Sequence, residues 1–142
     1  FEACSHFQNL GYEIIIVTNQ SGIQRGFYTE NDYKTLTQWM IKQFQNNNIK
    51  ILDIFHCPHG PRSKCDCRKP KPGMFDEAKN KYKINMNKSW MIGDSERDIG
   101  AANSAGITKT ILVRSGQKIN EETSKSLYTL DSIKNADQII LK

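Results

Sequence analysis

No stretch of this sequence approaches the roughly eighteen consecutive apolar residues that a membrane-spanning helix needs, so no membrane span is predicted. The opening residues, FEACSHFQNLGYEIII, have no basic start and only a short apolar run, unlike a secretion signal. Aromatic residues make up only 9%, do not alternate with the lysines, and no nucleic-acid recognition motif is present. We therefore expect a cytoplasmic protein with neither a membrane nor a nucleic acid as partner.

The chain has 142 residues, of which 37% are hydrophobic and 25% are charged, as is typical of one globular domain. Its formal charge of +5 has two interpretations. Most of it can belong to solvated lysines on helix faces. Alternatively, it attracts an anionic partner, for which a small phosphorylated substrate suits the pattern better than a nucleic acid.

Apolar runs alternate with amphipathic segments along the chain. The apolar runs predict strands at 12–20, 51–57, 89–94 and 108–113. The amphipathic segments predict one helix over 29–47, with a capping box at Thr29 and Asp32, and another that opens near Pro72. A short helix and a last short strand are expected within 131–141. This alternation predicts an α/β fold, a Rossmann-like parallel sheet with helices on both faces.

Three of the four cysteines lie within the short stretch 57–67, together with one histidine. Cys57, His59, Cys65 and Cys67 would form a Cys3His set, which is typical of structural zinc with no open coordination position. The alternative is a group of free thiols in a surface loop. Without a secretion signal, clustered cysteines indicate metal ligands more often than disulfides.

The ends of the predicted strands carry groups that suit phosphate. Arg68 and Lys69 follow the cysteine cluster directly, and both side chains bind phosphate oxygens well. Thr18 and Ser21, within TNQSG, offer hydroxyl groups, and Asp94 follows a buried strand, where a carboxylate suits Mg²⁺. The alternatives are a solvated basic loop and, for Asp94, a helix N-cap. Because parallel strands bind ligands at their carboxyl ends, we expect these groups at one edge of the sheet.

Taken together, three motifs resemble the haloacid dehalogenase (HAD) superfamily of phosphohydrolases. They are VTNQSGIQRG, CPH…CDCRKPKPGM and MIGDSERDI, and they look most like the D-glycero-D-manno-heptose-1,7-bisphosphate phosphatase family. Histidinol-phosphate phosphatases are similar and share such a zinc loop. The resemblance runs from Phe1 to about Arg114, and we interpret 1–142 as a single phosphatase domain.

The resemblance implies a role for each motif. Thr18 and Lys69 match residues that stabilise the transferring phosphoryl group, and Asn19, Gln20 and Ser21 match substrate-binding positions. Arg68 matches a residue that recognises the sugar phosphate. Asp94 matches a Mg²⁺ ligand, and Cys57, His59, Cys65 and Cys67 match Zn²⁺ ligands.

The implied activity is removal of the 7-phosphate from the heptose bisphosphate, on the pathway to the inner-core sugar of lipopolysaccharide, by an enzyme that we expect to be a monomer. Alternatives are a histidinol-phosphate or other sugar-phosphate phosphatase, and a non-catalytic, zinc-stabilised module that binds phosphate.

One part of the family pattern is absent. The family begins with a strand ending in Asp-x-Asp, whose first aspartate is the nucleophile and whose second is the general acid and base. No Asp-x-Asp precedes Thr18 in this sequence. We therefore expect an N-terminally incomplete domain whose first central strand is absent; the alternative is a remnant that binds and does not catalyse.

Overall fold

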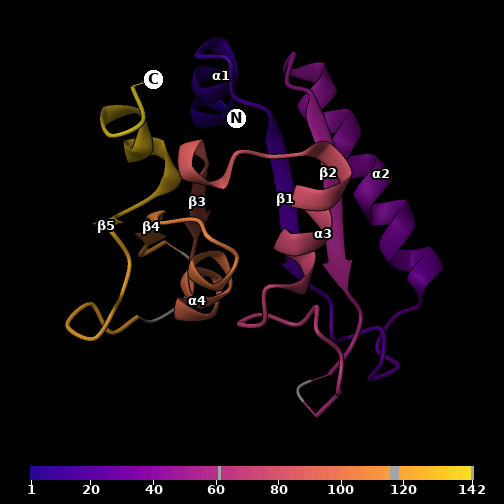
Figure 1. Ribbon diagram of the computed structural model, residues 1–142. Coiled ribbons are helices and arrows are strands. Elements are labelled where there is room, and N and C mark those ends of the chain that lie inside the picture. Colours follow the sequence, from indigo (N-terminus) through magenta and orange to yellow (C-terminus); the bar gives the residue numbers. More distant parts are fainter. Residues whose placement is uncertain (61, 116–118, 142) are drawn as a thin grey trace. The chain divides into compact units, whose positions relative to one another are not determined.

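The computed structural model describes residues 1–60, 62–115 and 119–141 (Figure 1). Its elements in chain order are α1 (Glu2–Asn9), β1 (Ile14–Asn19), α2 (Glu30–Asn46), β2 (Ile51–Cys57), α3 (Gly73–Tyr82), the 3₁₀ helix η1 (Met86–Lys88), β3 (Trp90–Gly93), α4 (Glu96–Ser104), β4 (Lys109–Val113), β5 (Tyr128–Leu130) and the 3₁₀ helix η2 (Ile133–Gln138). The chain divides into two compact units, residues 1–65 with 137–142, and residues 66–136.

In the first unit, β1 and β2 form a parallel pair, with α2 beside them (Figure 1). The register places Thr18 opposite His56 and Asn19 opposite Cys57. The TNQSG segment and the cysteine loop therefore leave the sheet at the same edge, as expected for the carboxyl ends of parallel strands.

The helix α2 begins where the sequence predicts. The Thr29 hydroxyl accepts a hydrogen bond from the Asp32 backbone N–H at 3.0 Å, and the Asp32 carboxylate accepts one from the Thr29 N–H, also at 3.0 Å. This reciprocal pair confirms the predicted capping box, which satisfies two backbone donors at the helix start.

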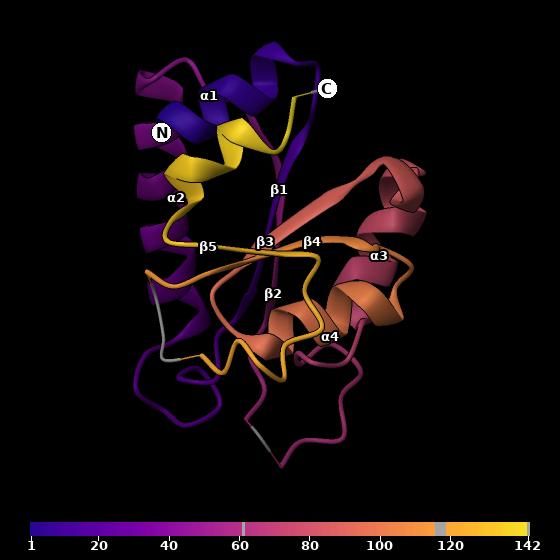
Figure 2. The ribbon, with the colours of Figure 1, turned by 90° about the vertical axis from the view of Figure 1, so that its left-hand side faces the viewer.

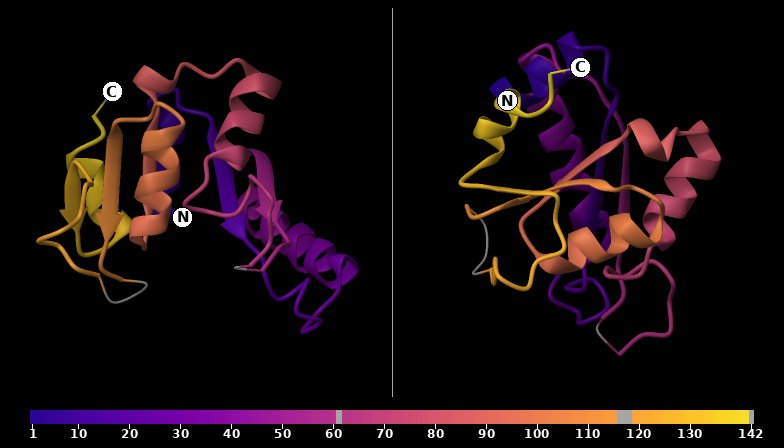
Figure 3. Two further views of the ribbon diagram at one scale, coloured as in Figure 1. Left: turned by 60° about the horizontal axis from the view of Figure 1, so that its bottom comes forward. Right: turned by 60° about the vertical axis from the view of Figure 1, so that its left-hand side comes forward.

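In the second unit, the parallel strands follow the order β3-β4-β5. Helix α4 packs against β3 and β4, and α3 lies beside α4 (Figure 2). A second view shows α4 running along the same two strands (Figure 3). Ile99 of α4 and Ile111 and Leu112 of β4 are almost fully buried, so the apolar run predicted at 108–113 supplies the centre of this core.

The prediction of an α/β fold with parallel strands is confirmed. The sequence suggested one sheet, but the described strands form two separate sheets. One contains β1 and β2, and the other contains β3, β4 and β5. All residues of β1 are only partly buried. No helix among the described residues is both long enough and apolar enough to cross a membrane.

The prediction for the C-terminal segment was wrong in part. The last strand is β5, at Tyr128–Leu130, upstream of 131–141, and within that range the chain forms η2 and no strand. Only three residues form β5, and Tyr128 is exposed. Its hydrophobic pattern is therefore too short to predict from sequence, and its pairing with β4 defines it.

Candidate active site

The loop after β1 is held by hydrogen bonds around Gln20. Its side-chain amide donates to the Thr18 hydroxyl at 3.0 Å, and its backbone N–H donates to the Cys57 carbonyl at 2.7 Å. Further on, the Arg25 N–H donates to the Ser21 carbonyl at 3.1 Å. Thr18, Asn19, Gln20 and Ser21 are all partly exposed, so this loop has a defined shape and reaches the protein surface.

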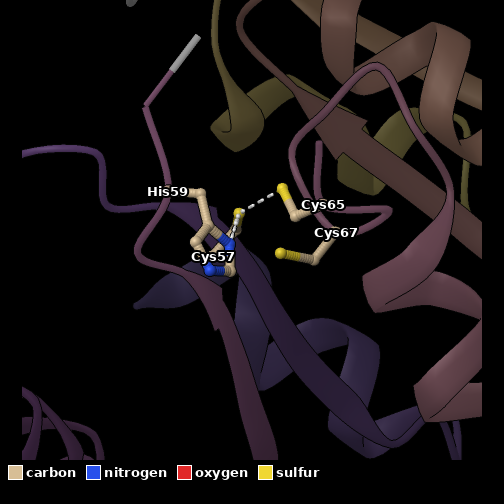
Figure 4. A group of neighbouring side chains, drawn as sticks. All are labelled: Cys57, His59, Cys65 and Cys67. Carbon is tan, nitrogen blue, oxygen red and sulfur yellow. Dashed lines mark hydrogen bonds between the residues drawn. The ribbon is translucent and has the colours of Figure 1, made fainter. Parts of the chain in front are cut away.

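The cysteine loop brings the predicted zinc ligands together. Cys57 Sγ lies 3.5 Å from His59 Nδ1 and 3.6 Å from Cys65 Sγ. The ligand atoms of these three residues and Cys67 all lie within 4.8 Å of one another (Figure 4).

The distances from Cys57 to His59 and to Cys65 match those around a tetrahedral zinc ion. Bond lengths of about 2.3 Å to sulfur and about 2.0 Å to nitrogen place neighbouring ligand atoms roughly 3.5–3.8 Å apart. The donor set is three thiols and one imidazole, which is common in structural zinc sites and leaves no ligand position for a reacting water. The residues therefore fit a structural metal ion better than a set of independent surface thiols.

The basic segment that follows forms a closed loop. The Gly73 N–H donates to the Asp66 carbonyl at 2.8 Å, and the Lys71 N–H donates to the Arg68 carbonyl at 2.9 Å. A Cβ at Gly73 would lie 2.2 Å from the Asp66 carbonyl oxygen, so only glycine permits this closure. Arg68 and Lys69 thus lie on a short loop held at both ends, and not on a freely solvated segment.

Lys69 is paired with the carboxylate of Asp98, a residue to which the sequence motifs assign no role. Its ammonium group donates to Asp98 Oδ1, and the two side chains are only 14% and 10% exposed. The other oxygen, Asp98 Oδ2, accepts the backbone N–H groups of Asp94 and Ser95, each at 3.2 Å. Asp98 therefore joins the lysine of one loop to the backbone of the loop after β3.

Ser95, and not Asp94, is the N-cap of α4. The Ser95 hydroxyl accepts the Arg97 N–H at 3.2 Å, and Ser95 and Asp98 form a capping box. The alternative interpretation of Asp94 as a helix N-cap is therefore wrong. The Asp94 side chain is partly exposed and directly follows β3. Its carboxylate is the type of ligand that Mg²⁺ favours.

Gly93 explains why Asp98 reaches this position. A Cβ at Gly93 would lie 2.5 Å from the Asp98 Cβ. The glycine that ends β3 therefore leaves the space that the buried carboxylate occupies. The sequence pointed to Asp98 only through its position in GDSERD, four residues after Asp94. Its partner Lys69 is 29 positions away in the chain, so the pairing could not be predicted.

We expect the charge of Asp98 to contribute strongly to stability. Replacing Asp98 by alanine should lower the free energy of unfolding by about 3–5 kcal/mol, because a buried ammonium group loses its partner. Asp98→Asn keeps an oxygen for the backbone N–H groups and should cost less. Urea unfolding measures both variants, and a loss under about 1 kcal/mol for Asp98→Ala, the range of an exposed pair, would contradict a buried ion pair.

Comparison with known proteins places these sites in a class. Residues 66–136 match the HAD-hydrolase-like family model. This range contains the Lys69 loop, β3, the Asp94 loop and α4. The parallel α/β fold is that of a HAD-like phosphatase, and the Lys69–Asp98 pair lies within the matched range.

Two relatives match most of this chain. The D-glycero-alpha-D-manno-heptose-1,7-bisphosphate 7-phosphatase of Photorhabdus laumondii is 43% identical over 138 residues, covering 89% of this chain and 75% of the relative. The D-glycero-beta-D-manno-heptose-1,7-bisphosphate 7-phosphatase of Vibrio cholerae is 41% identical over 150 residues, covering 100% and 81%. The chain belongs to the D-glycero-D-manno-heptose-1,7-bisphosphate 7-phosphatase family.

A solved structure of the same kind of enzyme is similar throughout the chain. The D,D-heptose 1.7-bisphosphate phosphatase from B. bronchiseptica, complexed with magnesium and phosphate, superposes with a TM-score of 0.84 at 26% identity. The match covers 99% of this chain and 80% of that one. The sequence resemblance to this family, and the phosphatase activity that it implied, are therefore confirmed.

Proposed function

We propose that this protein removes the 7-phosphate of D-glycero-D-manno-heptose 1,7-bisphosphate in a reaction that depends on Mg²⁺. The observation that carries the proposal is the identity of 41% with a named 7-phosphatase over the whole chain. The magnesium and phosphate bound by the similar solved enzyme also support it. We include in the proposal the expected cytoplasmic location and monomeric state.

The proposed roles of the residues follow from the charge of the phosphoryl group. Phosphoryl transfer depends mostly on positioning and on neutralising charge on the phosphate oxygens. We assign the Lys69 ammonium group and the Thr18 hydroxyl to these oxygens, and Arg68 to the sugar phosphate. Asn19, Gln20 and Ser21 would contact the substrate, as the family pattern implies.

The pairing of Lys69 with Asp98 suits this role. The ion pair with the Asp98 carboxylate limits the positions that the flexible lysine side chain can adopt. Lys69 would thus present a fixed positive charge to the substrate, with little conformational entropy left to lose on binding.

Asp94 would hold Mg²⁺, which supplies further neutralisation of phosphate charge when bound. In the family pattern, the nucleophile and the general acid and base are the two aspartates of an Asp-x-Asp pair, and a protein that carries this pair would use them in the same roles. Attack by the first aspartate on phosphorus would form an aspartyl-phosphate as the sugar oxygen leaves with a proton from the second. Water would then attack phosphorus while the second aspartate takes a proton from it, so that phosphate is released and both aspartates return to their starting protonation states.

Substrate choice provides the direct test. In a protein that carries the predicted Asp-x-Asp segment, we expect one phosphate to be released from C7 while the C1 phosphate is retained, as followed by ³¹P NMR. We expect kcat/KM to exceed that for histidinol phosphate by at least about 100-fold.

Both anomers of the bisphosphate should be assayed in parallel, because the two relatives are named for different anomers. A preference for histidinol phosphate would show that the protein is a histidinol-phosphate phosphatase and would contradict the proposed activity. Binding of phosphate without turnover in the same protein would instead support a non-catalytic module.

A further inference from the structure

Gln24 contacts the cysteine loop on both sides of one predicted zinc ligand. Its backbone N–H donates to the Pro58 carbonyl at 3.1 Å, and its side-chain oxygen accepts the Gly60 N–H. The first contact is to the peptide group before His59, and the second is to the peptide group after it. The two peptide groups that orient the backbone of His59 are thus both bound by one residue from another loop.

The loop that carries Gln24 is the one that carries the proposed phosphate-binding groups. The Ile23 N–H donates to the Gln20 carbonyl at 3.2 Å, so a tight turn connects Gln24 to Gln20. Gln20 itself is bonded to the Cys57 carbonyl at 2.7 Å and to the Thr18 hydroxyl at 3.0 Å. Hydrogen bonds and the short chain segment 20–24 therefore connect Thr18 to the peptide groups around His59.

We propose that Gln24 is a positioning residue that couples the zinc site to the phosphate-binding loop after β1. This inference rests on the proposed zinc site and deepens the proposed function. Residues that orient metal ligands from outside the coordination shell commonly contribute 10–100-fold to metal affinity. Coupling between two sites is reciprocal, so a metal ion that fixes His59 also fixes the turn at Gln20–Gln24 and, through it, Thr18.

Burial supports an energetic role for the side-chain contact. Gly60 is buried, and its N–H has Gln24 Oε1 as acceptor. The hydrogen bond itself is partly buried, since Gln24 is exposed. Loss of the acceptor removes a partner from the Gly60 N–H, which destabilises the loop conformation in which His59 faces the cysteines. The Gln24 backbone contact to Pro58 would remain in a side-chain variant, so the effect should be partial.

Gln24→Met removes the acceptor at nearly constant side-chain length, and Gln24→Glu retains an acceptor oxygen. We expect Gln24→Met to bind Zn²⁺ about 10-fold more weakly in competition with a chromogenic chelator. Hydrogen exchange at the Gly60 amide should become faster by a similar factor. Gln24→Glu should restore both values to within a few-fold of the starting protein.

Gln38, exposed on α2, provides the matched control, and Gln38→Met should change neither zinc affinity nor Gly60 exchange. In the protein with the Asp-x-Asp segment, Gln24→Met should raise KM for the heptose bisphosphate more than it lowers kcat. Equal zinc affinity in Gln24→Met and Gln38→Met would overturn the proposed coupling. A starting protein that binds no zinc would instead overturn the zinc site itself, and it would leave the phosphatase assignment in place.

Discussion

Changing Cys65 to serine is expected to lower the zinc content and the melting temperature together. Cys65 Sγ lies 3.6 Å from Cys57 Sγ within the four-residue cluster. A serine hydroxyl replaces the thiolate with a much weaker zinc ligand. If free zinc is about 1,000 times its dissociation constant, the bound ion stabilises the fold by about 4 kcal/mol. Loss of that term should lower Tm by about 8–16 °C for a protein of this size.

The control is the same substitution at Cys4, which lies in α1 and outside the cluster. Burial raises the pKa of the Cys4 thiol, so this group stays protonated and is a poor metal ligand. Cys4→Ser should therefore keep a full zinc content, as measured by native mass spectrometry and by elemental analysis. If zinc were near zero in the freshly purified, unchelated starting protein, the proposed structural zinc would be wrong.

Lys69→Ala should reduce turnover at least about 100-fold, which is the loss common when one group that stabilises transition-state charge is removed. The measurement is kcat in the protein with the Asp-x-Asp segment, together with urea unfolding of the same variant. Some stability should also be lost, because Asp98 loses its ion-pair partner. The loss should stay moderate, since Asp98 keeps two backbone N–H donors, those of Asp94 and Ser95.

Two further variants separate catalysis from folding. Lys79→Ala removes an exposed lysine from α3 and should leave both turnover and stability close to the starting values. Lys69→Arg keeps the positive charge, so it should retain most of the stability, while the different shape of guanidinium should still impair turnover. Unchanged turnover in Lys69→Ala would show that the assigned phosphate role of this residue is wrong.

Much of the local structure could be predicted because it depends on residues close together in the chain. The Thr29–Asp32 capping box spans three positions, and each strand from β1 to β4 coincides with an apolar run. The clustering of the proposed zinc ligands could also be predicted, since Cys57 and Cys67 are only ten positions apart. These features need no knowledge of how distant segments meet.

The sequence by itself therefore determined the order of the strands from β1 to β4, the group of candidate metal ligands and the family of the enzyme. Only the tertiary structure decided that Asp98 pairs with Lys69 and that Gln24 binds the peptide groups around His59. Those partners are 29 and 36 positions apart. Hydrogen bonds and ion pairs require contact within a few ångströms, and for distant residues that contact depends on the packed fold, because no local periodicity encodes it.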